Sequence, residues 1–116
     1  MAHPFARLLR AAACLALPLA LVAPVRAEEP TVVTVTIKDH RFTPSEIRVP
    51  AGKPIVLHVR NEDPTAEEFE SRPLKVEKVI AGGKTGTVRI RALEKGRYPF
   101  VGEFHEATAT GVLVAE

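Results

Sequence analysis

The sequence predicts an all-β protein, an antiparallel Greek-key β-sandwich of about seven strands. Three observations predict this fold class. Hydrophobic and polar residues alternate over short stretches, glycine- and proline-containing turns separate these stretches, and no segment shows a helical repeat long enough for an amphipathic helix. The 116 residues are enough for one compact domain and too few for two.

Residues 1–27 are predicted to be a cleaved secretory signal. Two arginines precede the apolar run 11–22, and Ala27 ends a small-residue pattern that a signal peptidase accepts. The run is shorter than the roughly 20 apolar residues that a membrane-spanning helix needs. Cys14 lies inside the apolar run, whereas a lipid-modified cysteine follows such a run. We therefore expect a periplasmic protein whose single domain is 28–116.

Removing the signal changes the composition. The only cysteine and the only methionine are lost, and three of the 16 basic residues go with them. The mature domain then has 13 basic and 14 acidic residues, a net charge of −1. This balance offers no basic patch for nucleic acid. Without cysteine the domain has no disulfide, so packing alone must hold it together.

The strands are predicted from the alternation. From Thr31, the residues Val33, Val35 and Ile37 alternate with polar neighbours, which is typical of a half-buried strand. The proline-rich stretch 41–54 that follows is expected to be turns and connections. Further strands are expected at Ile55, Leu57 and Val59, at 74–80, at 85–92 after a turn at 81–84, after the turn at 94–96, and at 111–114.

Three motifs resemble the cupredoxin-like domains. They are "FTPSEIRVPAGKPIVLHVRNED", "EEFES" and "IAGGKTGTVRIRALEKGRYPFVGEFH", and they occur in the family's order over nearly the whole mature chain. The resemblance implies a cupredoxin-like sandwich with a metal site at one end.

The sequence departs from the copper-binding members of that family at their ligands. The usual first histidine falls on Glu67, the usual cysteine on Gly102, and the usual methionine on the stretch 108–110, while His105 is retained. A blue-copper centre requires two histidines and a cysteine with a weak axial ligand. The resemblance therefore implies a metal site without blue copper.

A narrower resemblance is to the cysteine-poor cupredoxin domains of bacterial iron-uptake systems. It rests on "EEFES", "LKVEKVIAGGKTG" and "LEKGRYPFVGEFHEATATG". The relatives are the amino-terminal domains of EfeO-type periplasmic proteins and the small cupredoxin partners of Ftr-type iron permeases. This resemblance implies a role in iron uptake, with an iron permease or another periplasmic uptake component as partner, including docking at the inner membrane.

Four residues are the candidate metal ligands. His105 and Glu67 stand at positions where the family places ligands, and Glu103 lies between the lost cysteine and His105. His40 precedes Phe42 by two residues, a place that the family's topology puts on the loop at the copper end. Further or supporting candidates are Glu68, Glu77 and Glu106. Each of these residues also has a plain interpretation as a solvated surface side chain.

The donor set decides which metals are expected. Two imidazoles with carboxylates suit Fe(II), Cu(II), Zn(II) or Mn(II), with iron or copper expected here, and disfavour Cu(I). The leading hypothesis is metal binding for iron uptake. The enzymatic alternative is oxidation of Fe(II) before transport, and the third hypothesis is a metal-free docking module. Neither Ser45 nor Ser71 lies in a nucleophile-elbow pattern, so nothing indicates a hydrolase.

Overall fold

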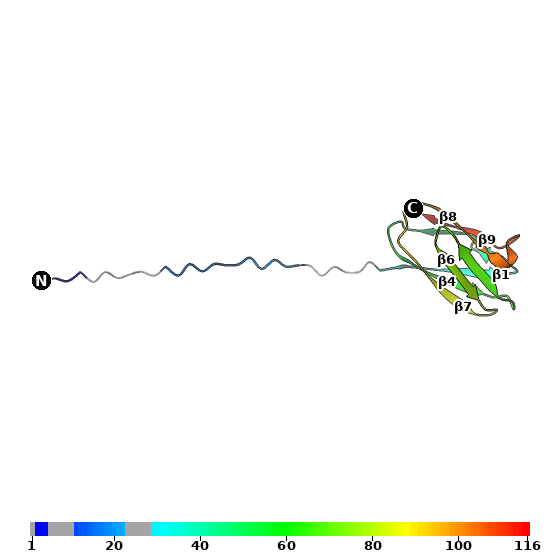
Figure 1. The fold of residues 1–116 in the computed structure, drawn as a ribbon, viewed down its shortest axis with the longest axis horizontal. Coiled ribbons are helices and arrows are strands. Elements are labelled where there is room, and N and C mark those ends of the chain that lie inside the picture. The colour runs from blue at the N-terminus through cyan, green and yellow to red at the C-terminus, as the bar shows by residue number, and fades with distance from the viewer. Residues whose placement is uncertain (1, 5–10, 23–28) are drawn as a thin grey trace.

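A computed structural model of the protein describes residues 2–4, 11–22 and 29–116 (Figure 1). Residues 11–22 have no regular secondary structure, and their side chains are exposed. The predicted signal cleavage after Ala27 lies outside the described residues. In the described parts of the chain, no helix is both long enough and apolar enough to cross a membrane.

Nine strands form two sheets (Figure 1). The first sheet has the order β2-β1-β4-β7, and the second has the order β3-β9-β8-β5-β6. A short 3-10 helix, η1, follows β8. The elements are β1 Thr31–Lys38, β2 Arg41–Thr43, β3 Glu46–Val49, β4 Ile55–Asn61, β5 Glu67–Ser71, β6 Val76–Ile80, β7 Thr85–Ile90, β8 Gly96–Gly102, η1 Glu103–His105 and β9 Thr110–Ala115.

The predicted all-β sandwich is confirmed, but two details of the prediction are wrong. There are nine strands instead of about seven: none was expected at β5, nor at β2 and β3, which lie in the proline-rich stretch 41–54. The strands β2 and β3 have only 3 and 4 residues, so they are too short for a clear alternation. The sheets are also mixed and not purely antiparallel, since β1 pairs in parallel with β4 and β3 with β9.

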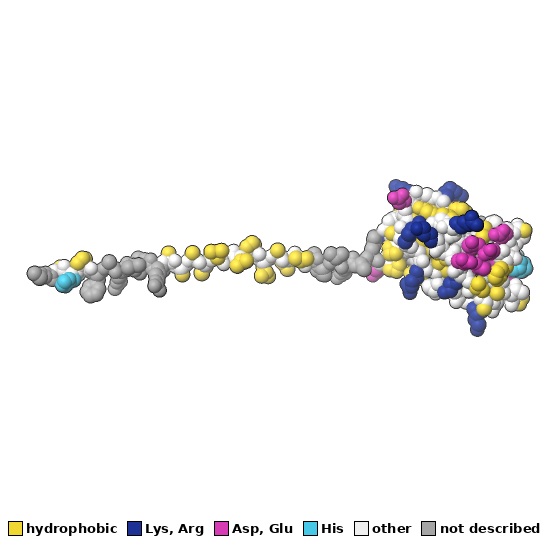
Figure 2. All heavy atoms as spheres, in the orientation of Figure 1, with side chains coloured by type: hydrophobic (Ala, Val, Ile, Leu, Met, Phe, Trp, Pro, Cys, Tyr) yellow, Lys and Arg dark blue, Asp and Glu magenta, His cyan; other side chains and the backbone are white. Residues whose placement is uncertain are grey.

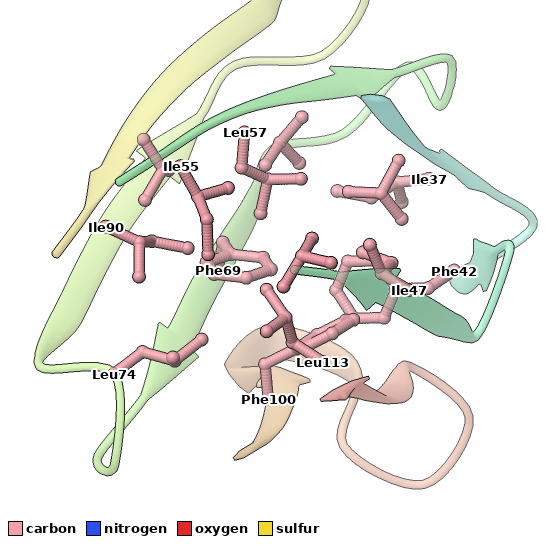
Figure 3. Packing of buried hydrophobic residues seen from close by; sticks show 14 of the residues in the cluster. Ile37, Phe42, Ile47, Ile55, Leu57, Phe69, Leu74, Ile90, Phe100 and Leu113 are labelled. Carbon is pink, nitrogen blue, oxygen red and sulfur yellow. The ribbon is translucent and has the colours of Figure 1, made fainter. Parts of the chain in front are cut away.

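The core lies between the two sheets and is made by the inward-facing residues of the alternating strands (Figure 3). Phe100 of β8 lies at its centre, with ring centroids 4.9 Å from both Phe42 and Phe69. Ile37 and Leu57 cover these rings from the first sheet and are fully buried. Each such side chain contributes about 1.5–3 kcal/mol on burial, so packing can hold a domain that has no disulfide.

The connections at one end of the sandwich bring together residues distant in sequence. The turn after β1, the segment after β4 and the η1 helix all lie at this end. Glu62 N donates to Ile37 O at 2.8 Å, and η1 packs against β5. Figure 1 shows η1, in orange, at the opposite end of the domain from the amino-terminal segment. This end carries the candidate site.

Candidate metal site

His40 lies in a tight turn between β1 and β2 that a buried carboxylate holds in place. Asp39 and His40 have φ values of 52° and 56°, a left-handed backbone that residues with a Cβ rarely adopt. The Asp63 carboxylate accepts hydrogen bonds from Asp39 N at 2.8 Å and from His40 N at 3.0 Å. These bonds fix the turn and therefore the position of the His40 ring.

The charge of Asp63 is favoured by the same contacts. Burial on its own would raise the pKa of this carboxyl group. The two backbone N–H groups of His40 and Asp39, together with the nearby imidazoles of His40 and His105, outweigh burial and hold the pKa of Asp63 below its ordinary value. A negative charge is thus present beneath the histidines.

The imidazole rings of His40 and His105 stack on one another. Their centroids are 3.4 Å apart and the rings are inclined by 14°. Thr108 Oγ1 donates to His40 O at 2.6 Å, which ties the turn after β1 to the loop after η1. The fold thus brings together two predicted ligands that are 65 residues apart in the chain.

Glu67 lies beneath this stack with only 1% of its surface exposed. Its Oε2 is 2.5 Å from His105 Nδ1. Its Oε1 accepts hydrogen bonds from Phe104 N at 2.9 Å and from Glu68 N at 3.1 Å. Both oxygens are therefore occupied, so Glu67 orients the His105 ring, as carboxylates do behind metal-binding histidines.

Gly102 leaves the space that the Glu67 side chain fills. A Cβ atom at position 102 would lie 2.7 Å from Glu67 Cδ and 2.7 Å from Ala109 Cβ, closer than real Cβ atoms approach. The pairing of β5 with β8 sets this proximity, because Phe69 lies opposite Gly102. A carboxylate from β5 thus occupies the space that a side chain at position 102 of β8 would enter.

Glu103 belongs to a second group, on the other face of β5. One carboxylate oxygen from each of Glu68, Glu70 and Glu103 lies within 4.8 Å of the other two. Successive side chains alternate between faces, so Glu68 and Glu70 point away from the side that holds Glu67. Glu77, on β6, pairs with Glu70. Figure 2 shows acidic side chains gathered on one face, near the end of the sandwich that carries histidine side chains, which is called the histidine end below.

Proximity of these carboxylates opposes their ionisation. Hydrogen bonding with Glu77, followed by burial and the contact with Glu103, raises the pKa of Glu68 to about 7. The pKa of Glu70 is also raised, chiefly by its hydrogen bond with Glu103. Repulsion within the group therefore favours protons, or a cation, between the carboxylates.

The predicted ligand set is therefore divided between the two faces of β5. His40, His105 and Glu67 converge at the end of the sandwich, whereas Glu103 lies with Glu68 and Glu70. Glu106 lines a surface depression of about 360 Å³ together with Glu70 and Glu103.

Asp63, Glu70 and Thr108 also belong to these groups but were not among the residues predicted from the sequence. The first two could have been found: Asp63 belongs to the "NED" motif, and Glu70 shares a strand face with Glu68.

The donors present at the histidine end are nitrogen and oxygen atoms. A metal bonded to an imidazole lies in the plane of the ring, about 2.0–2.1 Å from the nitrogen. Parallel rings 3.4 Å apart direct their lone pairs into separate planes. A metal shared by His40 and His105 therefore requires one ring to turn out of the stack. Both histidines are partly exposed, which leaves room for that rotation.

One tautomer of His105 suits a metal. When Nδ1–H donates to Glu67, the other ring nitrogen, Nε2, keeps its lone pair available. The hydrogen bond with Glu67 thus fits a metal-binding imidazole. Residues 29–116 contain no cysteine, so the donors within them are nitrogen and oxygen atoms.

Comparisons with known proteins agree with this architecture. Residues 11–115 match the family model described as the cupredoxin-like domain. An uncharacterized protein of Rickettsia prowazekii (strain Madrid E) is 39% identical over 82 residues, which are 71% of this chain and 66% of the relative. The chain thus spans just under two thirds of that relative's length.

Solved structures show the same fold at low identity. Auracyanin A, a blue copper protein of Chloroflexus aurantiacus, matches with a TM-score of 0.65 and 15% identity, over 76% of this chain and all of that chain. The metal-binding domain of the Cu(I)-exporting ATPase CopA of Streptococcus pneumoniae D39 has a TM-score of 0.65 and 15% identity, with 73% and 84% covered. A purple cupredoxin from Nitrosopumilus maritimus has a TM-score of 0.55 and 15% identity, with 72% and 99% covered.

The sandwich, the histidine end and the family match lead to one conclusion. This chain belongs to the cupredoxin-like domain family.

Proposed function

We propose that this protein binds a transition-metal ion, Cu(II) or Fe(II), at the histidine end of the sandwich and serves iron uptake in the periplasm. The observation that carries the proposal is the convergence of His40 and His105 over the buried carboxylate of Glu67. A buried, fully hydrogen-bonded carboxylate behind a partly exposed imidazole is a common arrangement at metal sites.

Each of the three side chains has a distinct role in the proposed site. His105 binds the metal through Nε2, and Glu67 holds the ring in the tautomer that makes Nε2 available. His40 provides the second nitrogen after leaving the stack. Water, or a carboxylate of a partner, completes the coordination. Such a nitrogen and oxygen set favours Cu(II), Fe(II) or Zn(II) over Cu(I) and forms no blue-copper centre.

The metal-binding role is supported by the family. Auracyanin A is named as a blue copper protein, and the CopA domain was solved with Cu(I). The assignment to iron uptake is supported by the resemblance of "EEFES" and "RYPFVGEFHEATATG" to the cysteine-poor domains of iron-uptake systems. The partner in this proposal is an iron permease, or another periplasmic uptake component, to which the domain delivers its metal.

The proposal is tested by calorimetric titration of the purified protein with Cu(II), and with Fe(II) under anaerobic conditions. The variants are His40→Gln and His105→Gln. His58→Gln is the matched control, because His58 lies on the outer face of β4, where its Nδ1 contacts Thr87 Oγ1 at 3.2 Å.

We expect one metal per chain, with affinity reduced at least about tenfold in His40→Gln and His105→Gln and unchanged in His58→Gln. Affinity also falls as the pH is lowered, because the imidazoles must be unprotonated to bind. Dissociation constants weaker than about 10 µM for both metals, near −7 kcal/mol of binding free energy, would contradict the proposal. So would equal affinities in all three variants.

A further inference from the structure

We propose that Glu68, Glu70 and Glu103 form a second cation site, on the outer face of β5, that takes a hard divalent cation such as Mn²⁺ or Ca²⁺. The proposal is independent of the histidine site. It rests on the geometry of the three carboxylates, on one buried oxygen atom without a partner, and on the distribution of positive charge around them.

The geometry follows from strand register. β5 and β8 pair antiparallel with Phe69 opposite Gly102, and Glu103 follows Gly102 as the first residue of η1, which packs against β5. Glu70 follows Glu68 by two residues and so lies on the same face. The result is one oxygen from each carboxylate within 4.8 Å of the others, a spacing that allows one ion to contact all three.

Glu68 provides the observation that points to a ligand. Its side chain lies on the outer face of the sheet, yet only 9% of its surface is exposed. Its Oε1 is buried and, among the described residues, has no hydrogen-bond partner. A buried carboxylate oxygen without a partner is unfavourable unless a proton or a cation satisfies it. A cation held between Glu68, Glu70 and Glu103 would satisfy it.

Within the described residues, no salt bridge joins a positive side chain to Glu68, Glu70 or Glu103. The arginine salt bridges in the described residues are made with other glutamates, namely Glu46, Glu62 and Glu116. Arg72 is near enough to favour ionisation of Glu70, but it forms no salt bridge with that carboxylate. In the part of the chain that the structure describes, the three carboxylates therefore have no salt-bridge partner, although Arg72 lines the same depression as Glu70 and Glu103.

An ion can reach the group from the surface. Glu70 and Glu103 line the depression of about 360 Å³ beside the cluster, and Glu103 is itself exposed. Ca²⁺ takes six to eight oxygen ligands. Three carboxylates can supply part of such a shell, and water in the depression can complete it.

The chemical class of the ion follows from the donors. An all-oxygen, carboxylate-rich site suits Ca²⁺, Mn²⁺ or Mg²⁺, whereas imidazoles suit Cu(II) and Zn(II). The two faces of β5 therefore differ in the metals they favour. Because the sites are on opposite faces, each can be disabled without changing the residues of the other.

The test uses Mn²⁺ as the probe and measures free Mn²⁺ by electron paramagnetic resonance at pH about 8, above the pKa of about 7 of Glu68. The variants are Glu68→Gln and Glu103→Gln, which keep the side-chain shape and remove one charge. Glu94→Gln is the matched control, because Glu94 is exposed and outside the cluster. His105→Gln separates this site from the histidine site. The second readout is competition by Ca²⁺.

We expect one Mn²⁺ per chain with a dissociation constant of about 0.1–1 mM, the range of weak extracellular calcium sites. Ca²⁺ should displace it. Glu68→Gln and Glu103→Gln should each weaken binding about tenfold or more, because the affinity of such sites depends on ligand charge. Glu94→Gln and His105→Gln should bind as the unmodified protein does.

Three outcomes would overturn the second site. One is the absence of Mn²⁺ binding up to about 5 mM, beyond the range of weak calcium sites. Another is equal binding by Glu68→Gln, Glu103→Gln and Glu94→Gln. The third is loss of Mn²⁺ binding in His105→Gln, which would assign the ion to the histidine end. The Cu(II) titration of His40→Gln and His105→Gln tests the histidine site separately, so failure of the second site leaves the proposed function intact.

Discussion

At the scale of single residues, Glu67 and Gly102 depend on one another. The Glu67 carboxylate accepts hydrogen bonds from two backbone N–H groups and contacts His105. It can lie there because residue 102 has no Cβ. Glu67 and Gly102 therefore fit as a pair, because a side chain at position 102 would collide with the Glu67 carboxylate.

The substitution Glu67→Gln tests the role of the carboxylate. The amide oxygen can still accept from Phe104 N and Glu68 N, but the amide nitrogen then faces His105 Nδ1 as a donor, so the His105 proton moves to Nε2 and the lone pair there is lost. We expect the free energy of unfolding to fall by about 1–3 kcal/mol and Cu(II) affinity to fall about tenfold or more. Urea denaturation and calorimetry measure these changes. The same substitution at Glu94 should have no effect, and equal results at both positions would contradict this role.

The substitution Gly102→Ala tests the close approach. The added methyl group would meet Glu67 Cδ and Ala109 Cβ, each at 2.7 Å. Overpacking of a buried position destabilises a protein by about 1–3 kcal/mol, and here it also displaces the carboxylate from His105. We expect a lower midpoint of thermal unfolding together with weaker Cu(II) binding. Gly83 is open, with no atom within 4 Å of an added Cβ, but has a φ of 71°; Gly83→Ala should destabilise through backbone strain without affecting metal binding.

At the scale of elements, β5 carries the chemistry on both faces. Its inward residues Glu67 and Phe69 contact His105 and the aromatic core, while Glu68 and Glu70 form the acidic group outside. The η1 helix follows β8 directly, and its first residue, Glu103, lies with the acidic group, whereas its last residue, His105, contacts Glu67. The η1 helix thus contributes one side chain to the group on each face of β5.

The pKa of Glu68 predicts a pH dependence of stability. Its folded-state pKa is about 7 and its ordinary value is 4.5. Between these values the folded protein binds more protons than the unfolded chain, so stability falls as pH rises across this range. Glu68→Gln removes this effect. We therefore expect the substitution to raise the midpoint of thermal unfolding more at pH about 8 than at pH about 5.

Circular dichroism in metal-free buffer measures both midpoints. Glu94→Gln serves as the control for the loss of one exposed charge. An equal shift for Glu68→Gln at the two pH values would show that the carboxylates do not oppose one another in the folded protein.

At the scale of the whole molecule, much of the fold could be predicted from sequence. The alternation in β1, β4 and β7 marks residues that face the core, because one face of each strand must be buried. The short strands β2 and β3 were missed because prolines at 44 and 50 interrupt the pattern. Parallel pairing of β1 with β4 could not be predicted. It arises because the chain passes through β3 in the second sheet before it returns to the first sheet as β4, and no local sequence pattern marks this crossing.

The candidate site was predicted less completely than the fold. The family's topology was enough to expect His40 near His105. The position of Glu103 depends on the register of β5 with β8 and on the course of η1, neither of which is encoded in a local pattern. The ring stack and the hydrogen bonds of Glu67 depend on side-chain packing. These features required the folded structure.

The predicted signal segment yields an experiment on the intact protein. We expect a periplasmic extract to contain a mature form that begins at Glu28, because Ala27 ends the small-residue pattern. Mass spectrometry of the intact protein measures this directly. A substitution of Ala27 by a large residue should retain the uncleaved form, while the same change at the exposed residue Ala92 should not. Recovery of the full 116 residues from the extract would contradict the prediction.

The two ends of the sandwich differ in a way that matters for handling the protein. β1 runs from Thr31 toward the His40 turn, and β9 runs from the η1 loop away to Ala115. Both ends of the folded chain therefore lie opposite the stacked imidazoles (Figure 1). A tether on either end, whether to a sensor chip, a bead or a fused fluorescent reporter, presents the histidines outward to the solution.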